Sequence, residues 1–194
     1  MKTISSLCVF CGSSTRVGEA HRAAAERLGK LIAERGIRLV YGGGRVGLMG
    51  ILADAVIAGG GEVVGVIPEF LTQLELAHPT LTELRTVDTM HERKQLMSEL
   101  ADGFVVLSGG FGTLDETFEV LSWKQLGLHD KPVVLVSVAG FWEPFRSLVE
   151  GLVSEGFARP EHAKLFTLVA SVDDVFGALA ATPEPMIRAD SKWI

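Results

Sequence analysis

Short apolar blocks alternate along the chain with longer segments in which apolar residues recur every three or four positions. Apolar blocks of this length that end at glycine or proline are typical of buried β-strands. The longer segments have the period of amphipathic helices, as in 18–34, where Ala24, Leu28, Leu31 and Ile32 form one stripe. The predicted strands are 7–11, 37–41, 63–67, 84–87, 104–107, 132–137 and 165–169, and the predicted helices are 18–34, 46–58, 89–100, 113–126, 141–155 and 172–181.

Regular alternation of strand and helix predicts an α/β protein with a parallel sheet and right-handed crossovers. We therefore expect a single-domain Rossmann-like fold, a doubly wound parallel sheet of about seven strands with helices on both faces. The 194 residues, 47% of them hydrophobic, suffice for one domain with a substantial core. The domain is predicted to span 1–182, with a loose tail at 183–194. Only 69–82 interrupts the alternation, and it is expected to form an irregular loop or short helix.

Three glycine-containing turns directly follow predicted strands, at 12–14, 42–44 and 108–110. Parallel strands end at the same edge of their sheet, and ligands of such folds bind beyond that edge. These turns are therefore predicted to converge on one site.

The third turn, Ser108-Gly-Gly-Phe-Gly-Thr113, lies between a buried strand and the start of a helix. Glycines let backbone N–H groups approach a bound group, and a helix start adds unpaired N–H donors and a positive dipole end. This combination favours an anion site, most often for phosphate. The turn lacks the Gly-Lys-Ser/Thr of a P-loop and the third glycine of the dinucleotide fingerprint. Simple packing of strand against helix is the alternative interpretation.

Glu116 allows two interpretations at this stage. Thr113-Leu-Asp-Glu116 has the form of a capping box, with Thr113 as the N-cap and Glu116 as its reciprocal partner. Alternatively, the Glu116 carboxylate belongs to the chemistry of the site.

Gly109-Gly-Phe-Gly-Thr113 followed by Glu116 resembles the Pro-Gly-Gly-x-Gly-Thr-x-x-Glu signature of the LONELY GUY (LOG) family. Three further stretches fit the same family in the same order, at 9–14, 41–50 and 90–94, so the resemblance covers nearly the whole chain. The chain departs from the signature at Ser108, where the family has proline. Proline stiffens a turn, and serine can adopt the same backbone at a modest entropic cost.

The resemblance implies a phosphoribohydrolase that activates cytokinins, in a family often mislabelled lysine decarboxylase. Such an enzyme hydrolyses the N-glycosidic bond of a purine nucleoside 5′-monophosphate, with AMP and N6-substituted adenosine monophosphates as the implied substrates. Arg93 and Glu116 would be catalytic. The implied substrate-binding residues are Glu75, Lys94, Gly109, Gly110, Phe111, Gly112, Thr113, Ser13 and Gly43.

The family is also typically homodimeric, and the chain offers Phe118, Leu121 and Trp123 for an interface or for its own core. A non-catalytic nucleotide or molybdenum-cofactor binding protein of the same superfamily is the alternative function.

These residue types suit the implied reaction. A positioned carboxylate stabilises an oxocarbenium-like sugar and can orient or deprotonate the attacking water. Arg93 can hold the phosphate or ribose, or stabilise charge on the departing purine. Glu119 lies on nearly the same helical face as Glu116, either as a supporting partner or as a solvated charge.

Charge and composition exclude several other classes. The net charge of −6 argues against a nucleic-acid or anionic-membrane surface. The sequence lacks a membrane-length apolar run and a secretory signal, so a cytoplasmic location is expected.

The potential metal and redox residues do not form a recognisable site. Cys8 and Cys11 on one strand would be about 10 Å apart, too far for a disulfide, so both are predicted to be structural. The five histidines lack ligand spacing, and no metal or other cofactor is predicted. A Gly-x-Ser-x-Gly elbow is absent, and nothing supports Lys94 as a Schiff-base lysine.

Overall fold

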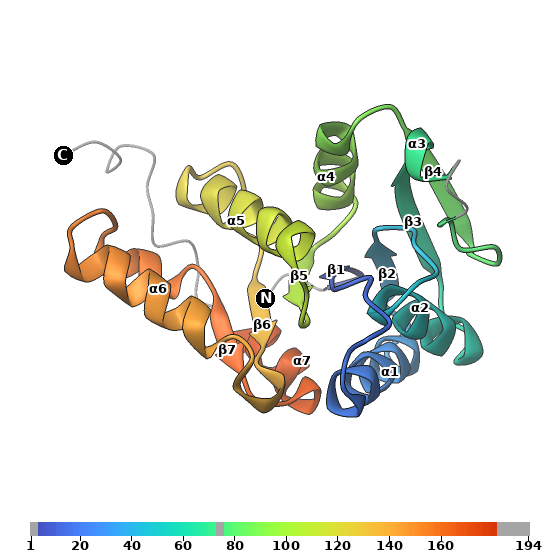
Figure 1. The fold of residues 1–194 in the computed structure, drawn as a ribbon, viewed down its shortest axis with the longest axis horizontal. Coiled ribbons are helices and arrows are strands. Elements are labelled where there is room, and N and C mark those ends of the chain that lie inside the picture. Colours follow the sequence, from blue (N-terminus) through green and yellow to red (C-terminus); the bar gives the residue numbers. More distant parts are fainter. Residues whose placement is uncertain (1–3, 73–75, 182–194) are drawn as a thin grey trace.

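The computed structural model describes residues 4–72 and 76–181 and contains a seven-stranded sheet in which every pair of strands is parallel (Figure 1). The strand order is β4-β3-β2-β1-β5-β6-β7, so the direction of winding reverses between β1 and β5. The strands are β1 (Ser6–Phe10), β2 (Arg38–Tyr41), β3 (Val63–Pro68), β4 (Glu83–Val87), β5 (Gly103–Val106), β6 (Val133–Val136) and β7 (Thr167–Val169).

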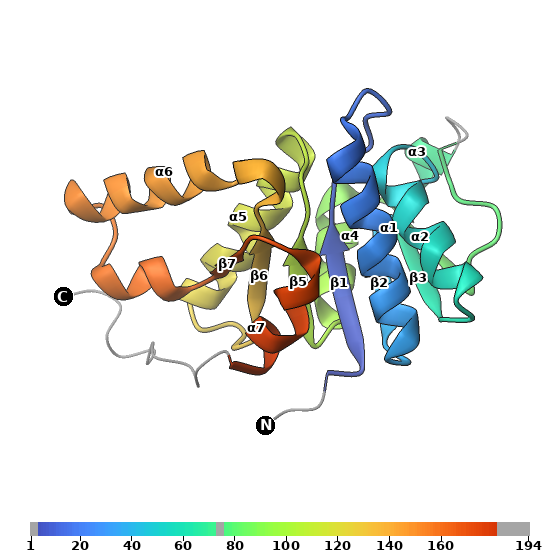
Figure 2. The ribbon, with the colours of Figure 1, turned by 90° about the horizontal axis from the view of Figure 1, so that it is seen from below.

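Helices cover both faces of this sheet (Figures 1 and 2). One face packs against α1, α2 and α7, and the other against α4, α5 and the start of α6. The α-helices are α1 (Glu19–Glu34), α2 (Leu48–Ala58), α3 (Glu69–Thr72), α4 (Met90–Glu99), α5 (Phe111–Gln125), α6 (Glu143–Ser154) and α7 (Val175–Ala181). The predicted doubly wound α/β fold is confirmed.

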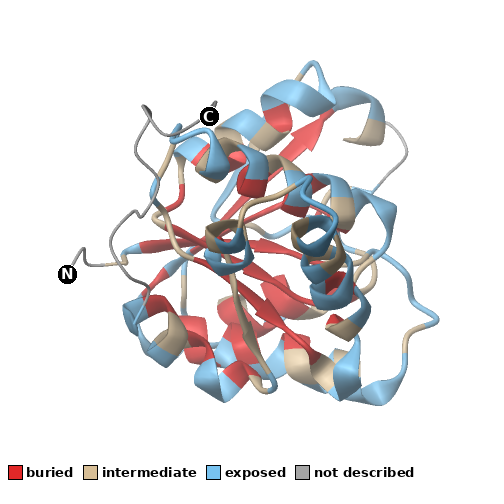
Figure 3. Ribbon diagram, turned by 90° about the vertical axis from the view of Figure 1, so that its left-hand side faces the viewer, coloured by how far each residue is buried: buried red, intermediate tan, exposed pale blue. Residues whose placement is uncertain are grey.

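Burial along the strands explains why they appear as apolar blocks in the sequence. Every residue of β1, β3, β5 and β6 is buried, whereas the edge strand β4 has none that is fully buried (Figure 3). Side chains alternate between the faces: Leu7 and Val9 enter the core beneath α1 and α2, and Cys8 and Phe10 the core beneath α4 and α5. Both cysteines are free and buried, as predicted.

Most predicted element boundaries lie within one or two residues of the observed ones. The helix predicted at 46–58 begins at Leu48, because Gly47 has a φ of 68° that no helix tolerates. The helix predicted at 172–181 is divided into a 3₁₀ turn at 172–174 and α7. Within 69–82, α3 forms a single helical turn. The predicted tail at 183–194 lies outside the described residues.

None of the helices in the described parts of the chain has the length and apolarity that crossing a membrane requires.

Close packing of α1 on α2 depends on Gly29. A Cβ at this position would lie 2.6 Å from Ala55 Cβ and 2.7 Å from the Leu52 carbonyl oxygen. Both distances are below any normal van der Waals contact, so the two helices approach each other through a bare backbone.

We expect Gly29→Ala to lower the free energy of unfolding by about 1–3 kcal/mol, because the added methyl group separates α1 from α2. Gly151→Ala in α6 is the matched control, since a Cβ there meets nothing within 4 Å. That change should stabilise the protein by roughly 0.5–1 kcal/mol through helix propensity. Urea unfolding of both variants tests this, and equal effects would contradict the packing argument.

Candidate active site

The three glycine turns lie at the same carboxyl edge of the sheet, because β1 is paired in parallel with both β2 and β5. The Gly12 amide donates to the Ser108 carbonyl oxygen at 3.0 Å, and the Leu48 amide donates to the Gly12 carbonyl oxygen at 3.0 Å. A Cβ on Gly47 would lie 2.4 Å from the carbonyl carbon of Ser13. The β1–α1 loop is therefore held between the β5–α5 turn and the start of α2.

The β5–α5 turn presents the free start of a helix. α5 begins at Phe111, its N-cap is Gly110, and no side chain caps it. The amides of Phe111, Gly112 and Thr113 therefore have no acceptor within the helix and are available to an anion. Gly109 must be glycine, because a Cβ there would lie 2.0 Å from Thr113 Oγ1. Phe111 projects outward and is 92% exposed.

The capping-box interpretation of Glu116 is wrong. α5 begins two residues earlier than predicted, which places Thr113 inside the first turn and Glu116 in the second. The Glu116 carboxylate instead meets Arg93 of α4, with Oε1 2.7 Å from Arg93 Nη1. Less than a tenth of either side chain is exposed.

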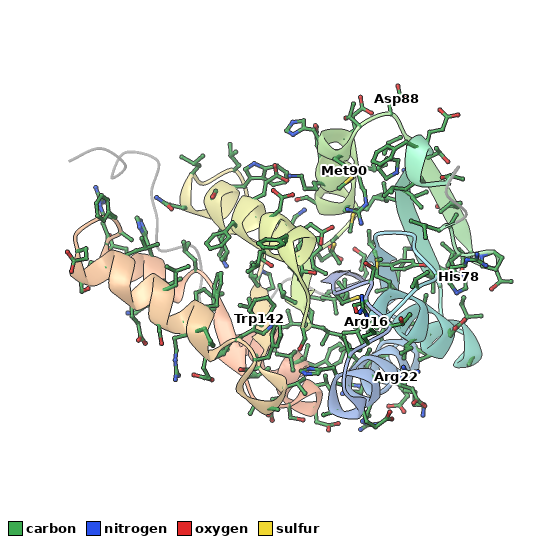
Figure 4. The ribbon with its side chains drawn as sticks, in the orientation of Figure 1. Arg16, Arg22, His78, Asp88, Met90 and Trp142 are labelled. Carbon is green, nitrogen blue, oxygen red and sulfur yellow. The ribbon has the colours of Figure 1, made fainter. Side chains whose placement is uncertain are left out.

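A true capping box supports the other member of this pair. Thr89 caps α4: its hydroxyl accepts the Glu92 amide at 3.1 Å. The Glu92 carboxylate accepts the Asp88 and Thr89 amides at 3.0 and 3.3 Å. Met90 and Asp88 mark this end of the helix in Figure 4. Arg93 therefore projects from a fixed first turn.

Three groups hold the Arg93 guanidinium. Its Nε donates to the Val66 carbonyl oxygen of β3 at 3.0 Å, and Nη1 donates to Glu116. On the third side lies Gly42, where a Cβ would be 1.9 Å from Nη2. Gly42 was not among the predicted site residues, although the glycine run at 42–44 indicated it.

Burial and charge oppose each other at Glu116. Burial raises the pKa of this carboxyl, and the charge and hydrogen bond of Arg93 act to lower it. The neighbouring Asp115 adds to the increase, and Lys94 opposes it. The net pKa lies above that of an ordinary glutamate.

A second group of charges lies beside the pair. Lys94 Nζ is 2.9 Å from Asp115 Oδ2 and 3.2 Å from Glu119 Oε2. Burial alone would lower the pKa of Lys94, but these two carboxylates outweigh it and raise the pKa. Glu119 is therefore a supporting partner rather than a solvated charge.

The other predicted site residues are placed less centrally. Ser13 is exposed on the β1–α1 loop. Gly43 has a φ of 72°, and its carbonyl oxygen accepts the His78 amide at 2.9 Å, so it contacts the segment that follows α3. The glycine beside Arg93 is Gly42. Glu75 lies outside the described residues.

The described residues do not assemble a metal centre at this site. Within residues 4–72 and 76–181, no group of three or more histidine, cysteine or carboxylate side chains is placed to hold a metal ion. A pocket of about 420 Å³ lies between the β1–α1 loop, α1 and α2. Its lining includes Ser14, Arg22, Arg45 and Asp54 but no residue of α4 or α5.

Comparison with known sequences shows close relatives. The sequence model of a family described as "Possible lysine decarboxylase" matches residues 49–179. The cytokinin riboside 5′-monophosphate phosphoribohydrolase of Rhodococcoides fascians is 48% identical over 184 residues, which cover 94% of this chain and 91% of the relative. The enzyme of that name, LOG, from Oryza sativa subsp. japonica is 50% identical over 151 residues, or 78% of this chain and 62% of the relative.

Solved structures with the same fold are more distant in sequence. The molybdenum cofactor binding protein from Rippkaea orientalis superposes with a TM-score of 0.70 at 19% identity, covering 93% of this chain and 98% of that one. The molybdenum cofactor carrier protein of Chlamydomonas reinhardtii superposes with a TM-score of 0.69 at 22% identity, covering 90% of this chain and 95% of that one. At this identity the likeness establishes the fold alone.

We expect Arg93→Met to lower the free energy of unfolding by about 3–5 kcal/mol at pH 8, because it leaves the buried Glu116 carboxylate without its partner. Without Arg93 the pKa of Glu116 rises further, so the folded variant binds a proton that the unfolded chain does not. Stability of the variant then decreases as pH rises, and its deficit should be smaller at pH 5.

Urea unfolding at both pH values measures this effect. Arg85→Met is the control, since its ion pair with Glu83 is exposed and should contribute less than about 1 kcal/mol. A deficit for Arg93→Met that is small, or equal at the two pH values, would contradict the buried-pair argument.

Proposed function

Because this chain belongs to the LOG family, we propose that it hydrolyses the N-glycosidic bond of purine nucleoside 5′-monophosphates. The products are the free base and ribose 5-phosphate. The buried Arg93–Glu116 pair carries this proposal, since it places a carboxylate one helical turn from a free helix start. The sequence relatives support it, because those named above are phosphoribohydrolases.

The start of α5 is the proposed phosphate site. Its free amides at 111–113 and its positive dipole end attract a dianion. Glu116 lies four residues after Gly112, about 6 Å further along the helix axis. A phosphate bound at the helix start would therefore place the ribose beside Glu116.

Glu116 is the proposed catalytic carboxylate. In the reaction the C1′–N9 bond breaks and its electron pair passes to the purine, while water adds to C1′ and one proton moves from that water to the base. A fixed carboxylate stabilises the positive charge that develops on the sugar and accepts the proton from water. Arg93 lowers the pKa of the carboxyl and so opposes the effect of burial. Its guanidinium is also proposed to stabilise charge on the departing purine.

Lys94 is the proposed nucleotide contact. Asp115 and Glu119 hold its ammonium group beside the catalytic pair and favour its charged form. AMP and its N6-substituted derivatives are the proposed substrates, in keeping with the names of the sequence relatives.

We also propose a homodimer that forms through α6. This helix buries only Phe145 completely, and Leu148 and Leu152 on its apolar side are 51% and 37% exposed. Phe118 of α5 continues the surface, with its ring 5.1 Å from that of Phe145. Leu121, an interface candidate in the sequence, is buried in the core.

Incubation of the purified protein with AMP and with isopentenyladenosine monophosphate should release free base, measured by chromatography. We expect Glu116→Gln to reduce turnover about 100-fold or more, because glutamine cannot stabilise the charged sugar. Arg93→Ala should abolish turnover. Glu99→Gln is the control, since Glu99 is an exposed glutamate of α4 outside the site. Nucleotide binding without release of base would instead support the carrier function.

Light scattering after gel filtration should give twice the chain mass of 20.8 kDa. Leu148→Glu should convert the protein to a monomer, because it places a charge in the proposed apolar contact. Ala20→Glu on the exposed side of α1 should leave the dimer intact. A wild-type protein that elutes as a monomer would refute the proposal.

A further inference from the structure

We propose that His21 is a positioning residue for the phosphate-binding turn, and that its hydrogen bond to Ser108 replaces the stiffening that proline gives in the family signature. His21 belongs to the first turns of α1, and its Nδ1 lies 2.8 Å from Ser108 Oγ. The inference rests on the proposed function, because it assigns the turn at 108–113 to the substrate phosphate.

Ser108 is attached at two points. It is buried, and its carbonyl oxygen accepts the Gly12 amide at 3.0 Å while its hydroxyl meets His21. The first contact joins the turn to the β1–α1 loop through the backbone, and any residue at position 108 could make it. The second requires a side-chain hydroxyl, which proline lacks.

Because position 108 is serine rather than proline, the backbone of this turn needs a contact of this kind to restrict it. Proline fixes φ near −65°, whereas serine followed by two glycines leaves the unliganded backbone many more conformations. A hydrogen bond from a rigid helix restricts the same residue from outside.

His21 is itself held in place. Its ring lies edge-on to Phe141, with 5.6 Å between ring centroids, and Phe141 lies edge-on to Trp142 at 4.9 Å. Trp142 is buried where β6 leads into α6. Figure 4 shows it on the α6 side of α1. The imidazole thus projects from α1 and packs against the β6–α6 connection.

The turn has little space in which to absorb a shift of Ser108. A Cβ on Gly12 would lie 3.2 Å from Gly109 Cα, and one on Gly109 would lie 2.0 Å from Thr113 Oγ1. Movement of Ser108 would therefore displace the amides at the start of α5. Glu116 is held separately by Arg93, so the effect should fall on phosphate binding more than on bond cleavage.

Steady-state kinetics with AMP test the inference. We expect His21→Ala and Ser108→Ala each to raise KM roughly three- to tenfold, the equivalent of one hydrogen bond, with kcat within about twofold of wild type. The KM of the double variant should be no higher than that of either single variant, because both substitutions remove the same contact. Ser108→Pro combined with His21→Ala should restore KM to near the wild-type value.

That rescue separates positioning from general stability, since a merely destabilised protein would not recover substrate affinity through a proline. Lys30→Ala, near the far end of α1 and exposed, is the control and should leave both constants unchanged. An unchanged KM in His21→Ala, a fall in kcat as large as the rise in KM, or failure of the proline rescue would overturn the inference. Absence of base release by the wild-type protein would instead refute the proposed function, and calorimetric AMP affinities of the same variants would then decide the role of His21.

Discussion

The buried ion pair between Arg93 and Glu116 is the interaction on which the site depends. Burial of two charges is costly unless both are well paired, and here the cost is offset by contacts from four elements. β3 supplies a carbonyl oxygen, the turn after β2 supplies a glycine without a side chain, and α4 and α5 supply the two charged groups. Loss of either charge leaves the other unpaired in the core.

Sheet topology makes this pairing possible. β5 lies between α4 and α5 in the chain, and both helices pack on the same face of the sheet. The winding direction reverses beside β5, which leaves the start of α5 open toward the β1–α1 loop. One helix thereby provides both the proposed phosphate site at its first turn and the proposed catalytic carboxylate at its second. This arrangement matches a substrate whose phosphate and scissile bond lie at opposite ends of one ribose.

Proteins with the same fold include molybdenum cofactor binding proteins, so the architecture does not by itself decide the chemistry. A carrier and a glycosidase differ in the side chains that they need at the carboxyl edge of the sheet. A carrier needs donors for an anion, which the start of α5 provides. A glycosidase also needs a fixed carboxylate beside the sugar, and the proposed one is Glu116, which is paired with Arg93 next to the charges around Lys94.

Local patterns in the sequence are enough to predict the sheet and the edge at which the candidate site lies. Apolar blocks and helical periods are local patterns, so strands, helices and the glycine turns after β1, β2 and β5 could be predicted from neighbouring residues. The N-cap at Thr89 was predictable for the same reason.

The partners of the polar side chains, in contrast, depend on contacts between segments that are distant in the sequence. Glu116 fits a capping box when its neighbours alone are considered, yet its partner lies 23 residues away on another helix. The Ser108 hydroxyl meets a histidine 87 residues away, and Gly42 rather than Gly43 adjoins Arg93 because of how β2 and α4 pack. Contacts between such distant residues leave no periodic pattern in the sequence. They arise when the sheet brings distant segments to one edge, where burial forces each charge to find a partner.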